Sequence, residues 1–209
     1  QTSDVLGQVD YMLVGVPLSL RYDSTDNQLD PTRGIRAVAS VTPYAAFGDN
    51  AAPFIQSKAS ISGYYALDED ARYVLAGRIG LGSIAGADLD EVPATRRFYA
   101  GGGGSVRGFG YQELGPKDPD SNPIGGRSLV EAAAEVRYRF GDYGVVGFID
   151  GGQVYTSSLP HFTDWRFGVG LGGRFYTNFG PMRLDLATPI DRQPGEARIS
   201  VYVSIGQAF

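Results

Sequence analysis

The sequence contains no cysteine among its 209 residues and no long apolar run. Without cysteine the chain can form neither disulfides nor thiolate metal sites, an absence that suits a bacterial envelope protein. A transmembrane helix needs roughly 18 or more consecutive apolar residues, and no such run exists. No apolar stretch near residue 1 marks a signal peptide, although a mature or truncated chain would not show one. The net charge of −5 argues against nucleic acid as a partner.

Glycine and aromatic residues are abundant instead, with 30 Gly, 13 Tyr and 11 Phe. A hydrophobic fraction of 43% and a charged fraction of 20% do not fit a disordered chain. Nine segments alternate apolar and polar residues, as β-strands do. They span residues 11–23, 34–44, 54–65, 73–85, 128–140, 143–154, 165–177, 181–187 and 197–208. Each is close to the roughly nine to eleven residues with which a tilted strand crosses a membrane, so the sequence predicts one all-β domain without helices.

The two faces of these segments predict an antiparallel barrel, but alternation alone fits a soluble barrel as well as a transmembrane one. In residues 128–140, for example, the apolar face is Val130, Ala132, Ala134, Val136, Tyr138 and Phe140, and the polar face is Glu131, Glu135, Arg137 and Arg139. Polar faces rich in Gly, Ser and paired opposite charges suit a wet lumen and favour the membrane. Aromatic residues also gather near strand ends, as they do at membrane interfaces. They are Tyr11, Tyr22, Tyr44, Tyr73, Tyr138, Phe140, Tyr143, Tyr155, Trp165 and Tyr176.

A polar connection of about forty residues, 86–127, joins the fourth and fifth of these segments. A loop of that length is usually functional or disordered, and its aromatic residues and central Arg107 make disorder the poorer interpretation. Gly101 to Gly104 do not predict a phosphate site, because no Lys-Ser/Thr and no helix follow them. The residues alone leave two interpretations of Arg107. It enters a lumen and binds acidic side chains there, or it is solvated while those acids bind Arg137 and Arg139.

The stretch Phe98-Tyr-Ala-Gly-Gly-Gly-Gly-Ser-Val-Arg-Gly-Phe109 resembles the signature loop of the BamA/TamA superfamily of outer-membrane assembly proteins. Three further stretches agree with that resemblance. They are Leu29–Gly34, similar to a periplasmic turn of the family; Gly147–Gly152, similar to its strand with a lumen-facing Asp; and Gly168–Arg174 with Gly180–Ala187, similar to its penultimate strands. The order and spacing, with about a hundred residues after the arginine motif, resemble the TamA branch. The resemblance covers essentially the whole chain.

The resemblance implies a transmembrane β-barrel of about 16 strands in the bacterial outer membrane. Residues 1–209 would be the C-terminal portion of that barrel, with about eight or nine of its strands and with the long loop 86–127. The chain contains no POTRA domain, and the resemblance places such domains upstream.

The resemblance also implies that the arginine of the loop reaches back into the lumen and pairs with acidic residues on later strands. The matching motif residues are Val106, Arg107, Gly108 and Phe109, and the matching acids are Glu135 and Asp150. A guanidinium offers five donors in a planar fork, so it can bind two carboxylates. Such a pair in a shielded lumen would pin the long loop.

The end of the chain carries a separate signal. Phe209 ends an apolar alternation that includes Val203 and Ile205. A terminal aromatic residue on an amphipathic last strand resembles the signal by which outer-membrane barrels are themselves recognised for assembly. The alternative is an ordinary last strand that happens to end in Phe.

The sequence predicts no enzyme, cofactor or metal site. His161, the only histidine, lacks a nucleophile with suitable context. Gly168 to Gly173 formally fit a dinucleotide pattern, but they lie inside an alternating strand with no helix after it. The acidic clusters Asp68–Asp70 and Asp88–Glu91 are most simply solvated connections.

The resemblance implies assistance to the folding and insertion of other outer-membrane proteins through a strand seam. The partners would be outer-membrane lipids, unfolded outer-membrane protein clients and, through upstream domains, a periplasmic or inner-membrane assembly partner. A two-partner secretion transporter and a passive or structural channel are the alternatives. Upstream POTRA domains would favour assembly or secretion over a passive pore, and a helix that plugs the barrel would mark the transporter.

Nine antiparallel strands cannot close on themselves conventionally, because the first and the last would run in the same direction. We therefore expect an eight-stranded closure that omits one segment, self-association through open edges, or strands missing from the chain. An eight-stranded barrel has room only for side chains inside, so closure would expel the loop 86–127.

Overall fold

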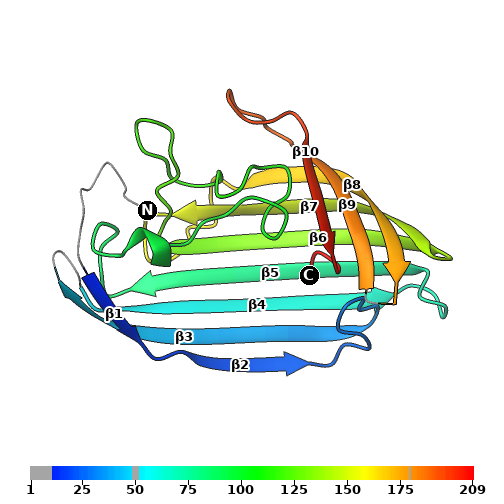
Figure 1. Ribbon diagram of the computed structural model, residues 1–209, viewed down its shortest axis with the longest axis horizontal. Helices are drawn as coiled ribbons and strands as arrows, with labels where there is room; N and C mark the ends of the chain where they lie inside the picture. Colours follow the sequence, from blue (N-terminus) through cyan, green and yellow to red (C-terminus); the bar gives the residue numbers. More distant parts are fainter. Residues whose placement is uncertain (1–10, 49–51, 179) are drawn as a thin grey trace.

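The computed structural model describes residues 11–48, 52–178 and 180–209 of the chain, and these form one antiparallel sheet (Figure 1). The strands are β1 (Tyr11–Gly15), β2 (Leu18–Asp23), β3 (Gly34–Gly48), β4 (Phe54–Ala66), β5 (Tyr73–Ala85), β6 (Ser128–Phe140), β7 (Tyr143–Tyr155), β8 (Arg166–Thr177), β9 (Gly180–Pro189) and β10 (Ser200–Ile205). A short 3-10 helix, η1 (Ala94–Arg96), lies in the loop 86–127. No helix among the described residues is long and apolar enough to cross a membrane.

Strands β1 and β2 act as one interrupted strand, because both pair with β3. β1 lies opposite Tyr44–Gly48 and β2 opposite Arg36–Val41. The interruption includes Pro17, which has no N–H to donate to the ladder. Counted together, they give nine strands that pair in chain order. The all-β antiparallel fold class is therefore confirmed.

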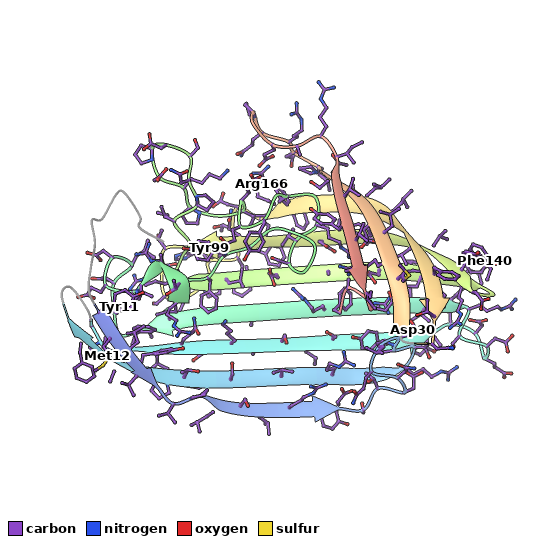
Figure 2. All side chains as sticks on the ribbon, viewed as in Figure 1. Tyr11, Met12, Asp30, Tyr99, Phe140 and Arg166 are labelled. Atoms are coloured by element: carbon purple, nitrogen blue, oxygen red, sulfur yellow. The ribbon has the colours of Figure 1, made fainter. Side chains whose placement is uncertain are left out.

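The two ends of the sheet differ in their connections. The tight turn at Gly141 and Asp142 lies at one end, and the loops 86–127, 156–165 and 190–199 lie at the other. In outer-membrane barrels, short turns face the periplasm and long loops face the outside. We call these the short-turn end and the long-loop end. Figure 2 shows Phe140 and Asp30 toward the first and Tyr11 at the second.

The sheet is open. Within the described residues, β10 pairs only with β9, and β1 and β2 pair only with β3. The expected eight-stranded closure is wrong, because all nine strands pair and the loop 86–127 packs on the concave inner face (Figure 1). The sheet curls without closing, and its inner side therefore keeps room for the loop. Self-association through the two open edges stays a prediction.

The outer face of the sheet is apolar along its length. Leu171 and Val203 are 72% and 73% exposed, which is the arrangement of a surface that meets lipid rather than water. A row of aromatic rings crosses this face at the short-turn end, with successive centroids 4.6 to 6.4 Å apart. The row contains Tyr73, Tyr138, Phe140, Tyr143 and Phe175. It forms one interfacial girdle of the kind that the sequence predicted.

Two of the predicted girdle residues point inward instead. Tyr44 stacks on Phe54 with centroids 4.8 Å apart, at the edge of the inner cluster. Tyr176 lies under the Arg139 guanidinium, 4.0 Å from its carbon to the ring centroid. Their positions in the alternation explain this, because each falls on the polar face of its strand.

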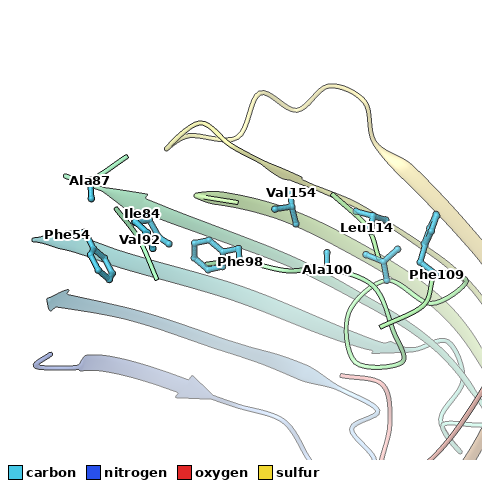
Figure 3. Close-up of a cluster of buried hydrophobic side chains, with 10 residues drawn as sticks. Phe54, Ile84, Ala87, Val92, Phe98, Ala100, Phe109, Leu114 and Val154 are labelled. Carbon is cyan, nitrogen blue, oxygen red and sulfur yellow. The ribbon is translucent and has the colours of Figure 1, made fainter. Parts of the chain in front are cut away.

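The main apolar core lies between the loop 86–127 and the inner face of the sheet (Figure 3). Its members are Phe54, Ile84, Ala87, Val92, Phe98, Ala100, Val106, Phe109, Leu114 and Val154. Strands β4, β5 and β7 supply three of these side chains at the long-loop end, and the loop supplies most of the rest. Burial of apolar side chains therefore orders the loop, and disorder is excluded for it.

Candidate functional site

The loop 86–127 places Arg107 against β7, with the side chain only 1% exposed. Its Nε donates to Asp150 Oδ2 at 2.7 Å and its Nη2 to Asp150 Oδ1 at 2.8 Å. The backbone N–H of Arg107 donates to the same carboxylate at 3.0 Å. This is a bidentate pair with a third, backbone hydrogen bond, a geometry that an arginine can form and a lysine cannot.

A second side of the same guanidinium faces two more carboxylates. Arg107 Nη1 lies 2.7 Å from Glu135 Oε1, an ion pair without an aligned hydrogen bond, and donates to Asp185 Oδ2 at 3.0 Å. The Phe148 ring lies beneath the guanidinium, 3.5 Å from its carbon to the ring centroid. The structure thus brings Arg107, Glu135 and Asp150 together.

Asp185 was missed by the sequence reasoning. It lies on β9, 78 residues from Arg107, and its side chain is fully buried. Its place on the polar face of an alternating strand was the available signal, but that signal is shared by every inward residue. Only the curl of the sheet shows that β9 brings this carboxylate to β7.

Three more arginines surround these acids. Arg137 Nε contacts Glu135 Oε2 at 2.8 Å, and Arg174 Nη1 contacts Asp185 Oδ1 at 2.5 Å. Arg183 Nε lies 3.5 Å from Asp185 Oδ2. We call the set of Arg107, Arg137, Arg174, Arg183, Glu135, Asp150 and Asp185 the ion cluster. Within the described residues, its positive charges exceed its negative ones by one.

The alternative interpretation of the acids holds only in part. Glu135 binds both Arg107 and Arg137, so the two partners are not exclusive. Arg139 does not join the cluster and lies 3.4 Å from Asp30 instead.

Glycines make the seat into which the arginine motif fits. A Cβ atom on Gly168 of β8 would lie 2.0 Å from the carbonyl oxygen of Arg107. Gly108 has φ of +104°, a conformation that other residues rarely adopt. The glycine pattern in residues 168–173 is therefore part of a strand, as predicted, and Gly168 gives the loop backbone a place to pack.

The C-terminus does not end in a strand as expected. Strand β10 stops at Ile205, and Gly206 turns the chain with φ of +93°. Phe209 stacks on Tyr64 of β4, with centroids 6.4 Å apart. Val203 and Ile205 remain on the exposed outer face. The glycine allows this turn, and the last residues consequently pack on the inner side near the short-turn end.

The turn that contains Leu29–Gly34 is organised by Asp26. Its Oδ1 accepts the N–H groups of Thr32 and Arg33 at 2.9 and 3.1 Å, and its Oδ2 accepts the Thr32 hydroxyl at 2.5 Å. Burial raises the pKa of the Asp26 carboxyl, but these hydrogen bonds together outweigh burial and hold the pKa below its usual value.

The remaining candidates form no site in the described part of the chain. His161 lies edge-on to the Tyr155 ring at 5.8 Å between centroids. Asp68 and Asp70 lie beside Arg72, and Asp88 lies beside Arg127. No group of three or more His, Asp or Glu side chains among the described residues could hold a metal ion.

Comparisons with known proteins show which proteins this chain is similar to. The model of the Omp85 superfamily domain matches residues 4–209. The outer membrane protein assembly factor BamA of Nitratidesulfovibrio vulgaris is 30% identical over 197 residues, and that of Neisseria meningitidis serogroup B is 25% identical over 222 residues. Each alignment covers 90% of this chain but only 24% and 28% of the relatives. The chain thus spans about a quarter of their length.

A solved structure shows the same fold. The crystal structure of BamA from Haemophilus ducreyi lacking POTRA domains 1–3 superposes with a TM-score of 0.74 at 22% identity. The superposition covers 90% of this chain and 41% of that one. An open sheet of this kind therefore corresponds to part of a larger barrel.

Proposed function

Because the chain belongs to the Omp85 superfamily, we propose that it assists the folding and insertion of other outer-membrane proteins. Its family places it in the bacterial outer membrane. The relatives are named as assembly factors, which agrees with the expectation that the chain is not an enzyme.

The free edge of β10 is the observation that most supports this function. Among the described residues, β10 has β9 as its single neighbour, so the backbone groups along its other side are open to a further strand. An unpaired edge is a template on which an incoming strand can add by main-chain hydrogen bonds. A strand of an unfolded client would pair there, with its apolar side chains beside Val201, Val203 and Ile205.

The length of the relatives supports the rest of the proposal. Residues 1–209 are the C-terminal portion of the barrel, and the open edge at β1 and β2 continues into earlier strands of the same barrel. The seam lies between β10 and the first strand of the complete barrel. Upstream POTRA domains contact a periplasmic or inner-membrane partner, and lipids cover the outer face. The order and spacing of the motifs favour the TamA branch, whereas the relatives found carry the name BamA.

The ion cluster holds the loop beside this seam. Arg107 binds acids from β6, β7 and β9 at once, so it ties the loop to three strands. Val106 and Phe109 on either side pack into the apolar core. The loop is therefore a fixed wall of the lumen next to β10 rather than a free extracellular segment.

Site-specific cross-linking tests the function, because the sequence has no cysteine to interfere. The complete protein is reconstituted in liposomes with Val203→Cys on β10, and an unfolded outer-membrane client carries one cysteine in its last strand. We expect a disulfide adduct at position 203 while the client folds. The control is Ile149→Cys, which is 42% exposed on the outer face of the interior strand β7 and should give no adduct.

Three outcomes would contradict the proposal. Equal adducts at positions 203 and 149 would mean that the client contacts the outer face of the sheet without preference for β10. A client that folds at the same rate with and without the protein would favour the passive channel, and a single protein that crosses the membrane without inserting would favour the secretion transporter.

A further inference from the structure

Tyr202 of β10 reaches from the edge strand to the arginine motif. Its hydroxyl accepts the Gly108 N–H at 3.0 Å and donates to the Phe109 carbonyl at 2.8 Å. Ser200, two residues earlier on the same face, donates to the Gly108 carbonyl at 3.3 Å. The two residues that follow Arg107 are thus held by the strand at the open edge.

The Tyr202 ring also touches the glycine run that precedes the motif. A Cβ atom on Gly103 would lie 2.9 Å from the ring, so only glycine lets the loop backbone come this close. Arg183 of β9 donates to the Gly103 carbonyl at 3.0 Å. The same tyrosine packs against the cluster of Val146, Phe148 and Ala187, and the Arg107 guanidinium lies on the Phe148 ring of that cluster. Tyr202 therefore contacts the loop both before and after Arg107, and it packs against the cluster that contains the ring under this arginine.

Strand β10 has little other support. It is six residues long and, among the described residues, pairs with β9 alone, and its outward side chains Val201, Val203 and Ile205 are more than half exposed. Segments with few buried contacts and half-used backbone groups open at low free energy. The links from Tyr202 and Ser200 to the loop are consequently a large share of what holds this strand.

We infer that Tyr202 is a positioning residue that couples the edge strand β10 to the arginine motif. Displacement of β10 breaks the two hydroxyl hydrogen bonds and loosens Gly108 and Phe109. Release of Arg107 loosens β10 by the same links, because coupling between two sites is reciprocal. If clients pair with β10, as proposed above, the loop responds to their arrival.

The hydroxyl and the ring of Tyr202 can be separated by experiment. Tyr202→Phe keeps the ring beside Gly103 and against the Phe148 cluster, and it removes both hydrogen bonds of the hydroxyl. Tyr64→Phe on β4 is the matched control: its hydroxyl is buried on the same inner face and has no hydrogen-bond partner in the described part of the chain. A role for the ring alone would leave both variants like the parent protein.

The readout is amide hydrogen exchange of the complete protein in lipid nanodiscs, with no client present. Tyr202→Phe should speed exchange about 5- to 30-fold both in residues 101–110 and in β10, while Tyr64→Phe changes neither. Arg107→Lys should also speed exchange in β10, and it should add little in the Tyr202→Phe background.

Acceleration in only one of the two segments, or independent effects of Arg107→Lys and Tyr202→Phe on β10, would overturn the coupling. Because no client is present, this result is separate from the cross-linking test. If the client forms no adduct with Val203→Cys, the proposed function is contradicted and the coupling is not affected. If the exchange results contradict the coupling, the proposed function is not affected.

Discussion

The inner faces of the two halves of the sheet differ sharply, although their outer faces are alike. Along β3 to β5 the inner face carries small side chains such as Ser40, Ser60 and Gly80, beside a cavity of about 1910 Å³. Along β6 to β9 it carries the ion cluster, in which the carboxylates are 0–1% exposed. The inner side of the first half borders an open cavity, whereas the inner side of the second half is filled by charged side chains.

This difference shows what determines the side chains on each face of the sheet. A surface that faces lipid has the same surroundings along every strand, so one rule of alternation describes the outer face of all the strands. The inner face is shaped by the loop 86–127, which packs on β4, β5 and β7 through apolar side chains and is bound to β6, β7 and β9 through Arg107. We therefore expect the outer face to serve contact with the membrane and the inner face of β6 to β10 to serve the proposed function.

Removal of the central cation should have the largest effect. Arg107→Ala leaves three buried carboxylates with one fewer partner, and we expect about 3–5 kcal/mol lower stability of the barrel, as for other broken buried pairs. Arg107→Lys should restore little, since an ammonium cannot form the bidentate contact. Urea unfolding in lipid measures the free energy of unfolding of both variants.

Arg78→Ala is the control from the other half. Arg78 binds Glu131 at 2.6 Å beside the cavity, where the two side chains are 18% and 11% exposed. Because the pair borders the cavity and Glu131 also accepts the Ser105 hydroxyl, we expect a smaller loss of about 1–2 kcal/mol, between those of exposed and buried pairs. Equal losses for Arg78→Ala and Arg107→Ala would remove the distinction between the halves.

A charge on the outer face should have the next largest effect on stability. Val203 is 73% exposed on β10, so Val203→Arg places a cation in lipid at a cost of about 2–4 kcal/mol near the midplane. Val203→Leu should be nearly neutral. Folding titrations in bilayers measure the difference, and a change within about 0.5 kcal/mol for the arginine would mean that this face does not meet the hydrocarbon.

Crowding the loop seat should have a smaller effect. Gly168→Ala puts a methyl group 2.0 Å from the Arg107 carbonyl oxygen, and overpacking of this kind costs about 1–3 kcal/mol. Gly173→Ala on the same strand meets nothing within 4 Å and should be tolerated. Protease access to residues 101–115 reports on the seat. A loop that stays protected in Gly168→Ala would show that the seat is not tight.

Acidification should give the smallest change, at the turn that Asp26 organises. The folded pKa of this carboxyl is lowered, so its contribution is complete above the unfolded pKa of about 3.9 and is lost as pH falls through the folded pKa. Exchange protection of Thr32 and Arg33, corrected for intrinsic rates, should be flat from about pH 7 to 5 and fall below about pH 4. Asp26→Asn should show no such step.

Much of the fold was predictable from the sequence, because the lipid imposes a period of two on every strand. The site was only partly predictable. Glu135 and Asp150 could be matched by motif, but Asp185 and Tyr202 reach Arg107 and its neighbours across 78 and 94 residues. Those contacts depend on how far the sheet curls, which alternation does not encode. The inward turn at Gly206 was missed for a related reason, since a terminal glycine fits a strand as well as a turn.

A double-mutant cycle on Arg107 and Asp150 tests the central claim most directly. The unfolding free energies of Arg107→Ala, Asp150→Ala and the double variant are measured in lipid, together with protease access to the loop. A buried, bidentate pair that fixes the loop predicts a coupling energy of about 1–3 kcal/mol and an exposed loop in all three variants. Effects that add within about 0.5 kcal/mol, with the loop still protected, would show that this pair does not hold the loop.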